Sequence, residues 1–385
     1  MKKIAIVFET NFSAASGMKN AVLSRIKALK LRSPFQIDVF CIHYKPAGLN
    51  RIIRKRIQDK PMDLEGIPIK TLWYKEYLFD DILSNRLRLP PFFMRFWYRK
   101  TSKMLADYDL ISTHGFTAGM LALVVKRHYS IPYYATWHGS DIHSAPYYSS
   151  YLMRSTTAVM KNAQGNFFVS HYLEREAKKI CSSIVSCVLY NGLSDVFYTY
   201  DKCRKEELRK KYRCQSTKVV AFVGSISEVK NVMVLPKLFK AINEKFLGDV
   251  VFWVIGEGYQ KTMLLDAVDN CKINCVFWGK IDLLEMPSLM NCIDVLVLPS
   301  KKESFGLVLL EAIACGANAV GSNTGGIPEV IGDDNVFDLS DSFVDKTSSR
   351  VVEMLKGNVK QEVGPFFNWD MTAIKEMSFY KKALL

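Results

Sequence analysis

Short apolar runs alternate with longer amphipathic stretches along the whole chain. Apolar runs bounded by turn residues are typical of buried parallel strands, and apolar residues that recur every three or four positions are typical of helices. In the first half this pattern predicts strands at residues 4–8, 37–42, 67–73, 110–112, 133–137, 165–169 and 185–190. It predicts helices between them at 18–31, 117–128, 151–162 and 171–180.

The same alternation starts again in the second half. Strands are predicted at 218–223, 250–255, 275–278, 295–298 and 319–321, and helices at 231–246, 284–291 and 305–315. Each half opens with its own strand, glycine turn and helix, which favours two doubly wound α/β sheets in tandem over a single barrel. The length of 385 residues also favours two domains. We place the N-terminal domain at 1–190 and the C-terminal domain at 191–367, with a charged linker and a short helix at 194–217.

The charge of the chain points to an anionic partner. The formal net charge is +14, while 49% of residues are hydrophobic, as in a globular protein. One basic run, R-I-I-R-K-R, occupies 51–56. A second stretch, 86–103, combines basic and aromatic residues without any acidic one.

Three interpretations of the stretch 86–103 are open. It is a solvated helix face over core aromatics, a membrane-surface or lipid-acceptor patch, or a nucleic-acid site, although the chain shows no nucleic-acid-binding module. We expect no nucleic-acid partner. In the membrane interpretation Pro90 and Pro91 break the helix and present Phe92, Phe93 or Trp97 as a loop. The residues assigned to this acceptor or membrane side are Arg95, Trp97, Arg99 and Lys100.

The nine cysteines are scattered and lack the paired spacing of a zinc site, so reduced thiols are expected. His43, His128, His143 and His171 show no ligand spacing with one another or with the cysteines, and we expect neither a metal nor a cofactor. The N-terminal apolar run is too short for a signal peptide, and no window of about 18 apolar residues occurs. The expected location is the cytoplasm, at most peripheral on the inner face of the cell membrane.

The segment 298–316 carries the most specific chemistry. A buried strand ends at Pro299, a polar loop contains Glu303, and Ser304 can cap a helix that starts at Phe305. The first-turn amides of such a helix favour an anion, for example a pyrophosphate. Glu311 lies two turns further on, in an otherwise apolar helix where a buried carboxylate needs a partner. The alternative is that both glutamates are ordinary solvated charges.

The same segment resembles the E-x7-E signature of the family four retaining glycosyltransferases, the "glycosyl transferases group 1". Further similar motifs are V-G-S-x-S-x-x-K at 223–230, G-E-G at 256–258, F-W-G at 277–279, G-G-I-P-E at 325–329 and Y-N-G at 190–192. In the first half H-G-S-D at 138–141 and the pair Ser16 and Gly17 resemble the acceptor-side motifs. The closing F-N-W-D…F-Y-K-K-A-L resembles the last helices of the family, which cross back onto the first domain; this implies a helix at about 368–385 there.

The resemblance implies a GT-B fold, in which two Rossmann-like doubly wound α/β domains face each other across a cleft. It implies that Glu311 holds the ribose, Glu303 the transferred sugar, and the amides of Phe305, Gly306 and Leu307 the diphosphate. Lys230 would neutralise the leaving group and His138 would contact the sugar or acceptor. The implied catalytic residues are His138, Lys230 and Glu303. The implied donor-binding residues are Gly17, Gly224, Ser225, Lys230, Gly258, Ile281, Glu303, Ser304, Phe305, Gly306, Leu307 and Glu311.

The implied function is retaining, metal-independent transfer from a nucleotide sugar, on family frequency a UDP-sugar, to a lipid-linked or cell-surface glycan such as lipopolysaccharide or capsule. One departure bears on it: Ser225 stands where the family usually has arginine, and Asn231 where it has glycine. Lys301 or Lys302 could replace the missing charge. The alternatives are a sugar-nucleotide epimerase of the same fold and a degenerate homologue that binds a glycan or partner without turnover.

Three weaker signals have plain structural explanations. The G-E-G sequence at 256–258 lacks the third glycine of a dinucleotide site and is predicted to be a tight turn. Asp107 and Asp109 form a D-x-D pair, which we interpret as a strand-entry turn rather than a metal site. His114 and Gly115 either line the active site or form a structural turn.

Overall fold

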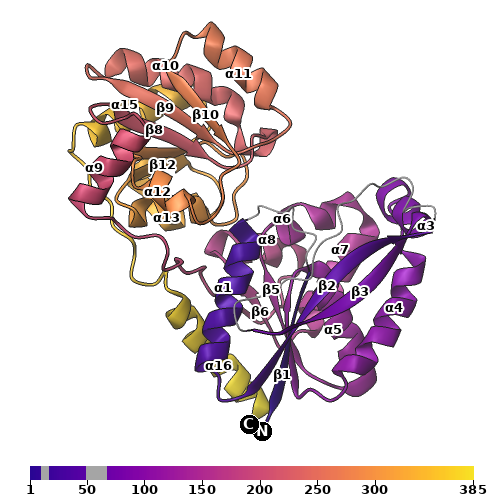
Figure 1. The fold of residues 1–385 in the computed structure, drawn as a ribbon. Helices are drawn as coiled ribbons and strands as arrows, with labels where there is room; N and C mark the ends of the chain where they lie inside the picture. The colour runs from indigo at the N-terminus through magenta and orange to yellow at the C-terminus, as the bar shows by residue number, and fades with distance from the viewer. Residues whose placement is uncertain (10–16, 49–66) are drawn as a thin grey trace. The chain divides into compact units, whose positions relative to one another are not determined.

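A computed structural model describes residues 1–9, 17–48 and 67–385 of the chain. Ser16 and the basic run 51–56 lie outside the described residues. The chain divides into two compact units, one formed by 1–192 together with 368–385 and the other by 193–367. Figure 1 shows that each unit is an α/β structure with its own sheet.

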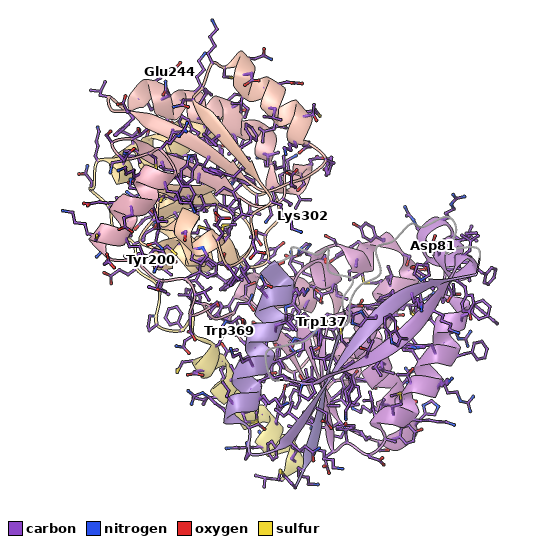
Figure 2. The ribbon with its side chains drawn as sticks, viewed as in Figure 1. Asp81, Trp137, Tyr200, Glu244, Lys302 and Trp369 are labelled. Carbon is purple, nitrogen blue, oxygen red and sulfur yellow. The ribbon has the colours of Figure 1, made fainter. Side chains whose placement is uncertain are left out.

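The sheet of the first unit has seven parallel strands in the order β3-β2-β1-β4-β5-β6-β7. Their bounds are β1 Lys3–Glu9, β2 Gln36–Ala47, β3 Ile69–Tyr77, β4 Leu110–His114, β5 Tyr133–Trp137, β6 Gly165–Phe168 and β7 Ser186–Val188. The strand order reverses between β1 and β4, so the chain leaves these two neighbours in opposite directions. The central strands β1, β4, β5 and β6 are almost entirely buried, as Trp137 at the end of β5 illustrates (Figure 2).

The main helices of this unit are α1 Gly17–Arg32, α4 Phe92–Ser102, α5 Phe116–Tyr129, α7 Ser150–Asn162, α8 His171–Ile180 and α16 Trp369–Leu384. Shorter turns are α3 Leu78–Asp81, η1 Ile82–Arg86, η2 Lys103–Leu105, α6 Ser140–His143 and η3 Ala145–Tyr148. Helices α1 and α16 pack together over one part of the sheet, where Val22, Ile26 and Met377 join the apolar core (Figure 1).

Helix α16 is fastened to the first unit by a buried ion pair. Nε of Arg25 on α1 donates to Glu376 on α16 at 2.6 Å, and both side chains are almost completely excluded from water. Tyr380 adds a hydrogen bond to Ser112 on β4 at 2.7 Å. At the start of α16 the Y-N-G glycine is required, because a Cβ on Gly192 would lie 2.3 Å from the backbone nitrogen of Trp369.

The second unit has a six-stranded parallel sheet in the order β10-β9-β8-β11-β12-β13. The strands are β8 Lys218–Val223, β9 Val250–Ile255, β10 Cys275–Gly279, β11 Val295–Leu298, β12 Asn318–Ser322 and β13 Val336–Phe337. The helices are α9 Lys202–Lys211, α10 Leu235–Lys245, α11 Lys261–Asn270, α12 Met286–Met290, α13 Leu307–Ala314, α14 Ile327–Ile331 and α15 Phe343–Leu355. Three short turns complete it: η4 Glu228–Lys230, η5 Val232–Val234 and η6 Asp333–Asn335. Here the strand order reverses between β8 and β11.

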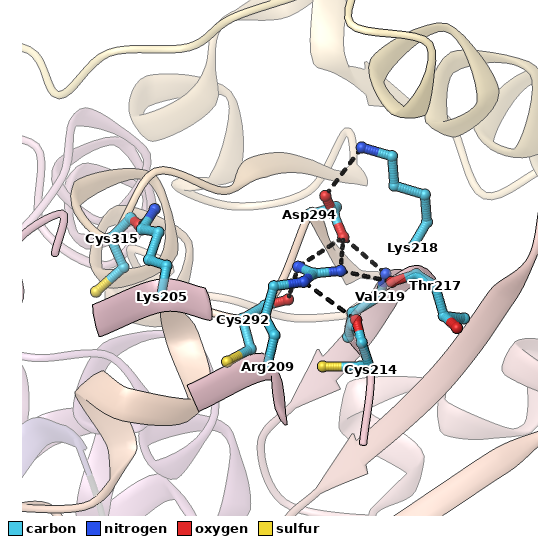
Figure 3. A network of polar contacts seen from close by, with 9 residues as sticks. All are labelled: Lys205, Arg209, Cys214, Thr217, Lys218, Val219, Cys292, Asp294 and Cys315. Atoms are coloured by element: carbon cyan, nitrogen blue, oxygen red, sulfur yellow. Dashed lines mark hydrogen bonds and ion pairs between the residues drawn. The ribbon is translucent and has the colours of Figure 1, made fainter. Parts of the chain in front are cut away.

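A polar network joins helix α9 to the sheet (Figure 3). The guanidinium of Arg209 contacts the Asp294 carboxylate at 3.4 Å. It also donates to three backbone oxygens, those of Cys214, Thr217 and Cys292. Asp294 in turn accepts a hydrogen bond from the backbone of Val219 at 2.8 Å, so the linker helix is tied to the start of β8.

The predicted strands of both sheets are confirmed, with shifted ends such as β3, which runs to Tyr77 rather than to residue 73. The predicted helix 231–246 begins later, at Leu235, after the turn η5. The strand-entry interpretation of the D-x-D pair fits the structure, because Asp109 accepts from the backbone nitrogen of Lys3 at 2.8 Å. In the described part of the chain no helix is long and apolar enough to cross a membrane.

The buried pair yields the first prediction. Replacing Glu376 by alanine leaves the Arg25 guanidinium buried without its carboxylate, which typically costs about 3–5 kcal/mol. We expect a loss of that order in the free energy of unfolding, measured by urea denaturation. The double variant Arg25→Met, Glu376→Leu should recover most of it, since no charge is left buried.

The exposed ion pair between Arg32 and Asp370 joins the same two helices and provides the matched control. Asp370→Ala should change the unfolding curve little, because exposed pairs contribute little to stability. If Asp370→Ala lowered the free energy of unfolding as much as Glu376→Ala does, burial of the charge would not be the cause of the destabilisation.

Candidate active site

The strand reversal of the second unit brings two loops together. In a parallel sheet, adjacent loops diverge where the order reverses, and ligands bind at the carboxyl ends of the strands at this point. The loop after β8 contains Gly224 to Lys230, and the loop after β11 contains Glu303. The backbone nitrogen of Lys301 donates to the oxygen of Val229 at 2.8 Å, so the two loops are directly joined.

An ion pair spans these loops. Nζ of Lys230 lies 2.5 Å from Oε2 of Glu303, and both side chains are largely buried, with 21% and 16% of their surface exposed. Glu303 also accepts from the backbone nitrogen of Ser304 at 3.1 Å. The structure therefore brings together two of the three predicted catalytic residues.

Glycines permit the close packing around this pair. A Cβ on Gly325 would lie 1.7 Å from the backbone oxygen of Glu303, and the nitrogen of Gly326 donates to that same oxygen at 3.0 Å. The G-G-I-P-E loop is thus a backbone clamp on the loop that carries Glu303. On the other side, a Cβ on Gly256 or Gly258 would meet the backbone oxygens of Gly224 and Ile226 at 1.9 and 2.1 Å. The predicted tight turn of G-E-G is confirmed, and its glycines are needed for loop contact.

Helix α13 starts later than the sequence predicts. Gly306 is the N-cap, with φ of +95°, and the helix begins at Leu307. The prediction that Ser304 caps a helix starting at Phe305 is wrong, because the left-handed backbone at Gly306 separates them. Phe305 is instead buried, with its ring 5.6 Å from that of Phe367.

Glu311 lies on α13 and is partly buried. Burial raises the pKa of its carboxyl to about 8. Within the described residues this carboxylate has no hydrogen-bond or ion-pair partner. The other side chains of the helix are all apolar. Two side chains hold the C-terminal end of α13. Thr199 donates to the oxygen of Ala314 at 2.9 Å. Lys205 donates to the oxygen of Cys315 at 3.1 Å, and both residues are drawn in Figure 3. A fixed helix with an unpartnered carboxylate is suited to accept ligand hydroxyls.

The positions that depart from the family pattern have different roles. Asn231 has φ of +53°, a left-handed conformation that glycine adopts without strain and asparagine tolerates, so this substitution keeps the backbone. Ser225 is exposed and its hydroxyl contacts that of Ser227 at 3.2 Å. Of the two lysines, Lys301 pairs with Glu228 at 3.2 Å, whereas Lys302 is exposed and has no partner among the described residues (Figure 2).

A second polar cluster lies at the strand reversal of the first unit. Glu9 ends β1, and its carboxylate accepts from the hydroxyl of Tyr44 at 3.1 Å and from the backbone amides of Phe116 and Thr117 at the start of α5. Burial raises the pKa of Glu9, and these hydrogen bonds partly oppose the rise. A Cβ on Gly115 would lie 2.6 Å from this carboxylate, which explains the glycine after His114.

Two histidines face each other beside this cluster. Nδ1 of His114, at the end of β4, lies 3.1 Å from Nε2 of His138, which follows β5, and the two rings are stacked. Burial, together with the nearby Arg25 charge, lowers the pKa of His138 to about 3. Burial also lowers the pKa of His114 well below its ordinary value. Both imidazoles are therefore neutral at pH 7, and the N–H of one ring donates a hydrogen bond to the unprotonated nitrogen of the other.

Asp141 fixes the turn that carries His138. Its carboxylate accepts from the backbone nitrogen of His138 at 3.2 Å and from that of Gly139 at 2.7 Å. Burial raises the pKa of Asp141 to about 6. The aspartate of H-G-S-D is thus a backbone anchor, and it orients the imidazole rather than presenting a free charge.

The remaining predicted site residues do not join either cluster through described contacts. Gly17 is the first residue of α1, and Ile281 follows β10, an edge strand two places from the strand reversal. The loop prediction for Phe92 and Phe93 is wrong, because α4 begins directly after Pro91. Trp97 is held against the protein, since its Nε1 donates to the backbone oxygen of Trp73 at 2.8 Å.

Two doubly wound parallel α/β units in one chain, each with a polar cluster at its strand reversal, are the components of a GT-B fold. Residues 36–195 match the family model "Glycosyltransferase Family 4", and 204–355 match "Glycosyl transferases group 1". Between them these matches cover most of the chain. It belongs to the family four GT-B glycosyltransferases.

Named relatives agree with this assignment. The chain is 28% identical over 236 residues to a putative teichuronic acid biosynthesis glycosyltransferase, TuaC, of Bacillus subtilis, covering 60% of this chain and 58% of the relative. It is 34% identical over 167 residues to the N-acetyl-alpha-D-glucosaminyl L-malate synthase of Bacillus anthracis, covering 42% of each. These two matches thus span less than two thirds of either relative.

A solved structure shares the fold over nearly the whole chain. Anabaena HepE in complex with UDP has a TM-score of 0.71 at 17% identity, covering 98% of this chain and 95% of that one. The same protein has been solved with UDP-glucose, with a TM-score of 0.68 at 17% identity, covering 98% of each chain.

The histidine pair gives a prediction that needs no substrate. The 15N chemical shifts of both imidazoles should show neutral rings with fixed tautomers from pH 8 to about pH 5, because their burial disfavours the charged forms. The same signals in urea-unfolded protein should titrate near pH 6.5. A His138 ring that becomes charged near pH 6.5 in the folded protein would contradict the buried pair.

Proposed function

We propose that this glycosyltransferase moves a sugar from a UDP-sugar, with retention of anomeric configuration and without a metal, to a lipid-linked or cell-surface glycan. The observation that carries the proposal is the largely buried pair of Lys230 and Glu303 beside the amino end of α13, with Glu311 on the same helix lacking a partner among the described residues. Positive groups for a diphosphate and acceptors for hydroxyls therefore lie at one strand reversal.

The diphosphate of the donor would bind where α13 begins. The amides of Gly306 and Leu307 are first-turn groups without a partner inside the helix, and the helix dipole adds positive potential there. Lys230 would turn from Glu303 towards the phosphate. Lys302, exposed on the same loop, is our candidate for the second charge in place of the usual arginine.

The transferred sugar and the ribose would each bind to one of the two carboxylates. Glu303 would accept hydrogen bonds from hydroxyls of the transferred sugar, and Glu311 from those of the ribose. During reaction the bond between the anomeric carbon and the phosphate oxygen breaks, and its electron pair leaves with the diphosphate. The acceptor oxygen bonds to the anomeric carbon on the same face, and its proton passes to a phosphate oxygen. Preorganised amides and Lys230 stabilise the charge that develops on the leaving group.

In the first unit, His138 would act as a neutral hydrogen-bonding group rather than as a general acid. Its lowered pKa leaves almost no imidazolium at pH 7. Bonded to His114 and anchored through Asp141, it can hold a hydroxyl of sugar or acceptor in one orientation.

Support for the donor and the pathway comes from the relatives. HepE binds UDP and UDP-glucose, and the TuaC relative is named for teichuronic acid biosynthesis, a glycan assembly. A UDP-sugar donor and a glycan acceptor are therefore the choices that we test first.

Binding of UDP should depend on pH through Glu311. Because the raised pKa keeps its carboxyl largely protonated below about pH 8, and the ionised form is the stronger acceptor, affinity should increase with pH. Between pH 6.5 and 8.5 we expect a gain on the order of 10-fold by calorimetry. Glu311→Gln should bind weakly and with little pH dependence.

The exposed Glu353→Gln serves as the charge-matched control and should follow the wild type. Equal affinity of the wild type for UDP at pH 6.5 and 8.5 would contradict the proposal that Glu311 binds the ribose.

Turnover should depend on Lys230. Lys230→Ala should lower the hydrolysis of UDP-glucose, measured with saturating donor, by roughly 100-fold, as loss of one electrostatic stabiliser does. Lys302→Ala should lower the rate less. Lys301→Ala should lower it least, because Lys301 is already paired with Glu228.

The wild-type rate of hydrolysis should persist in excess chelator. NMR should show that the sugar released first keeps the anomeric configuration of the donor.

Other outcomes select the rival functions. Conversion of the donor to its epimer without acceptor would favour the epimerase. Binding of UDP-sugars with no turnover under any condition would favour the degenerate homologue, for which the serine at position 225 is the motivating feature. An inverted anomer would overturn the retaining assignment.

A further inference from the structure

The first unit exposes a cluster of apolar side chains around α3, η1 and α4. Each member is a large hydrophobic residue with an exposed side chain: Phe79, Leu87, Leu89, Phe92, Phe93, Phe96 and Met104. Phe96 keeps 61% of its surface exposed and Phe79 keeps 53%. The four phenylalanines are in ring contact with one another, and contiguous exposed apolar surface marks a site of interaction with another molecule or a membrane. We call these seven residues the aromatic ridge.

The rings of the ridge contact one another, and Phe93 also packs on Tyr77 at the end of β3, with 4.6 Å between the ring centroids. Phe92 is 5.3 Å from both Phe93 and Phe96, centroid to centroid, and Phe79 is 6.3 Å from Phe92 and from Phe93. The other face of α4 does pack inward, through Tyr98 and Thr101. The centre of the ridge, with Phe92, Phe93 and Phe96, is therefore the outer face of an anchored helix.

A buried aspartate holds the ridge in place. The Asp80 carboxylate, 2% exposed, accepts from the backbone nitrogens of Phe93 and Met94 at 3.0 and 3.1 Å and from the hydroxyl of Tyr74. It thus caps the amino end of α4 from α3. The phenylalanines are presented by a fixed helix, so little conformational entropy is lost when they contact a partner.

The charges along η1, α4 and η2 are all positive, whereas Asp80 and Asp81 lie beside Phe79 on α3. Between residues 82 and 106 there is no acidic residue. Six basic residues are exposed there: Arg86, Arg88, Arg95, Arg99, Lys100 and Lys103. None of these six forms an ion pair with a described carboxylate. Apolar rings beside unpaired cations match the interface of an anionic bilayer, where rings lie among the headgroups and cations contact their phosphates.

We propose that the aromatic ridge is a docking surface for an anionic lipid bilayer, with Phe79, Phe92, Phe93 and Phe96 entering the headgroup region. Trp97 does not insert, because its indole is bonded to the backbone of Trp73 and packs on Tyr74 at 5.6 Å. The purpose of docking rests on the proposed function: it would bring the enzyme to a lipid-linked acceptor. The evidence for docking stands on the ridge alone.

The test uses the full chain and vesicle flotation. Wild-type protein should float with vesicles of phosphatidylcholine mixed with phosphatidylglycerol, and not with phosphatidylcholine alone. Binding should fall as salt rises, because the Debye length shrinks from about 8 Å at physiological ionic strength to about 3 Å at 1 M. The triple variant Arg95→Glu, Arg99→Glu, Lys100→Glu should weaken binding by 100-fold or more, on the order expected for reversing three surface charges.

A matched variant separates this surface from net charge. Lys210→Glu, Lys346→Glu, Lys356→Glu makes the same change in net charge on exposed lysines of the second unit and should keep vesicle binding. Phe92→Ser, Phe96→Ser should weaken binding by roughly 10-fold, because the inserted apolar surface is lost. Leu247→Ser, Leu284→Ser, at exposed leucines of the second unit, should not.

Each alternative occupant gives a distinct result. Equal flotation with neutral and anionic vesicles, or none with either, would overturn the proposal, as would equal loss in the lysine control. Self-association in analytical ultracentrifugation that the Phe92→Ser, Phe96→Ser variant abolishes would assign the ridge to a second copy of the chain instead. Hydrolysis of UDP-glucose, measured in every variant, keeps the two proposals apart: the ridge variants should retain it, and an inactive wild type that still floats would contradict only the proposed function.

Discussion

The reversal of strand order in each parallel sheet is the constraint on which the rest of the structure depends. Between β8 and β11 the chain leaves in opposite directions, so the loops that follow these strands are free to form a site at the carboxyl edge. In the second unit that edge holds the pair of Lys230 and Glu303. In the first unit the corresponding edge, between β1 and β4, holds Glu9 beside the buried histidines. The same topology thus yields two chemically different clusters.

What distinguishes the clusters is how each handles buried charge. The second unit pairs a cation with an anion and leaves Glu311 without a partner, at the cost of a pKa raised to about 8. The first unit keeps its histidines neutral and gives its carboxylates backbone partners. Ionised groups that can exchange partners suit a diphosphate, whereas a neutral, fixed imidazole suits hydroxyl recognition. This division follows from desolvation, which penalises every charge that lacks a partner.

Stability and function place opposite demands on the first unit. Burial of Arg25 with Glu376 joins α16 to α1, and the core extends through Tyr380 to β4. On α4, by contrast, Phe96 remains in water, where it contributes nothing to the core. Asp80 caps α4 and so fixes the helix that carries this exposed ring. Binding to a partner explains a fixed, exposed ring better than the folding of the domain does.

The sequence by itself determined the two sheets and the E-x7-E segment, because strongly apolar strands such as β8 and an apolar helix with a single carboxylate are local patterns. Helices α11 and α15 escaped prediction: α11 buries only Leu264 and Val268, and the period of α15 is interrupted by the buried Thr347 and Ser348. Only the tertiary structure decided the role of Glu9, which meets the amides of α5 because β1 and β4 are neighbours although paired residues such as Ile4 and Leu110 are 106 positions apart in sequence. It also decided that Gly306, not Ser304, is the N-cap of the helix, and that a glycine is needed at position 325 because of the close backbone of Glu303. Local sequence specifies periodicity and turn chemistry, but contacts between distant loops depend on which strands lie side by side, and no local pattern contains that information.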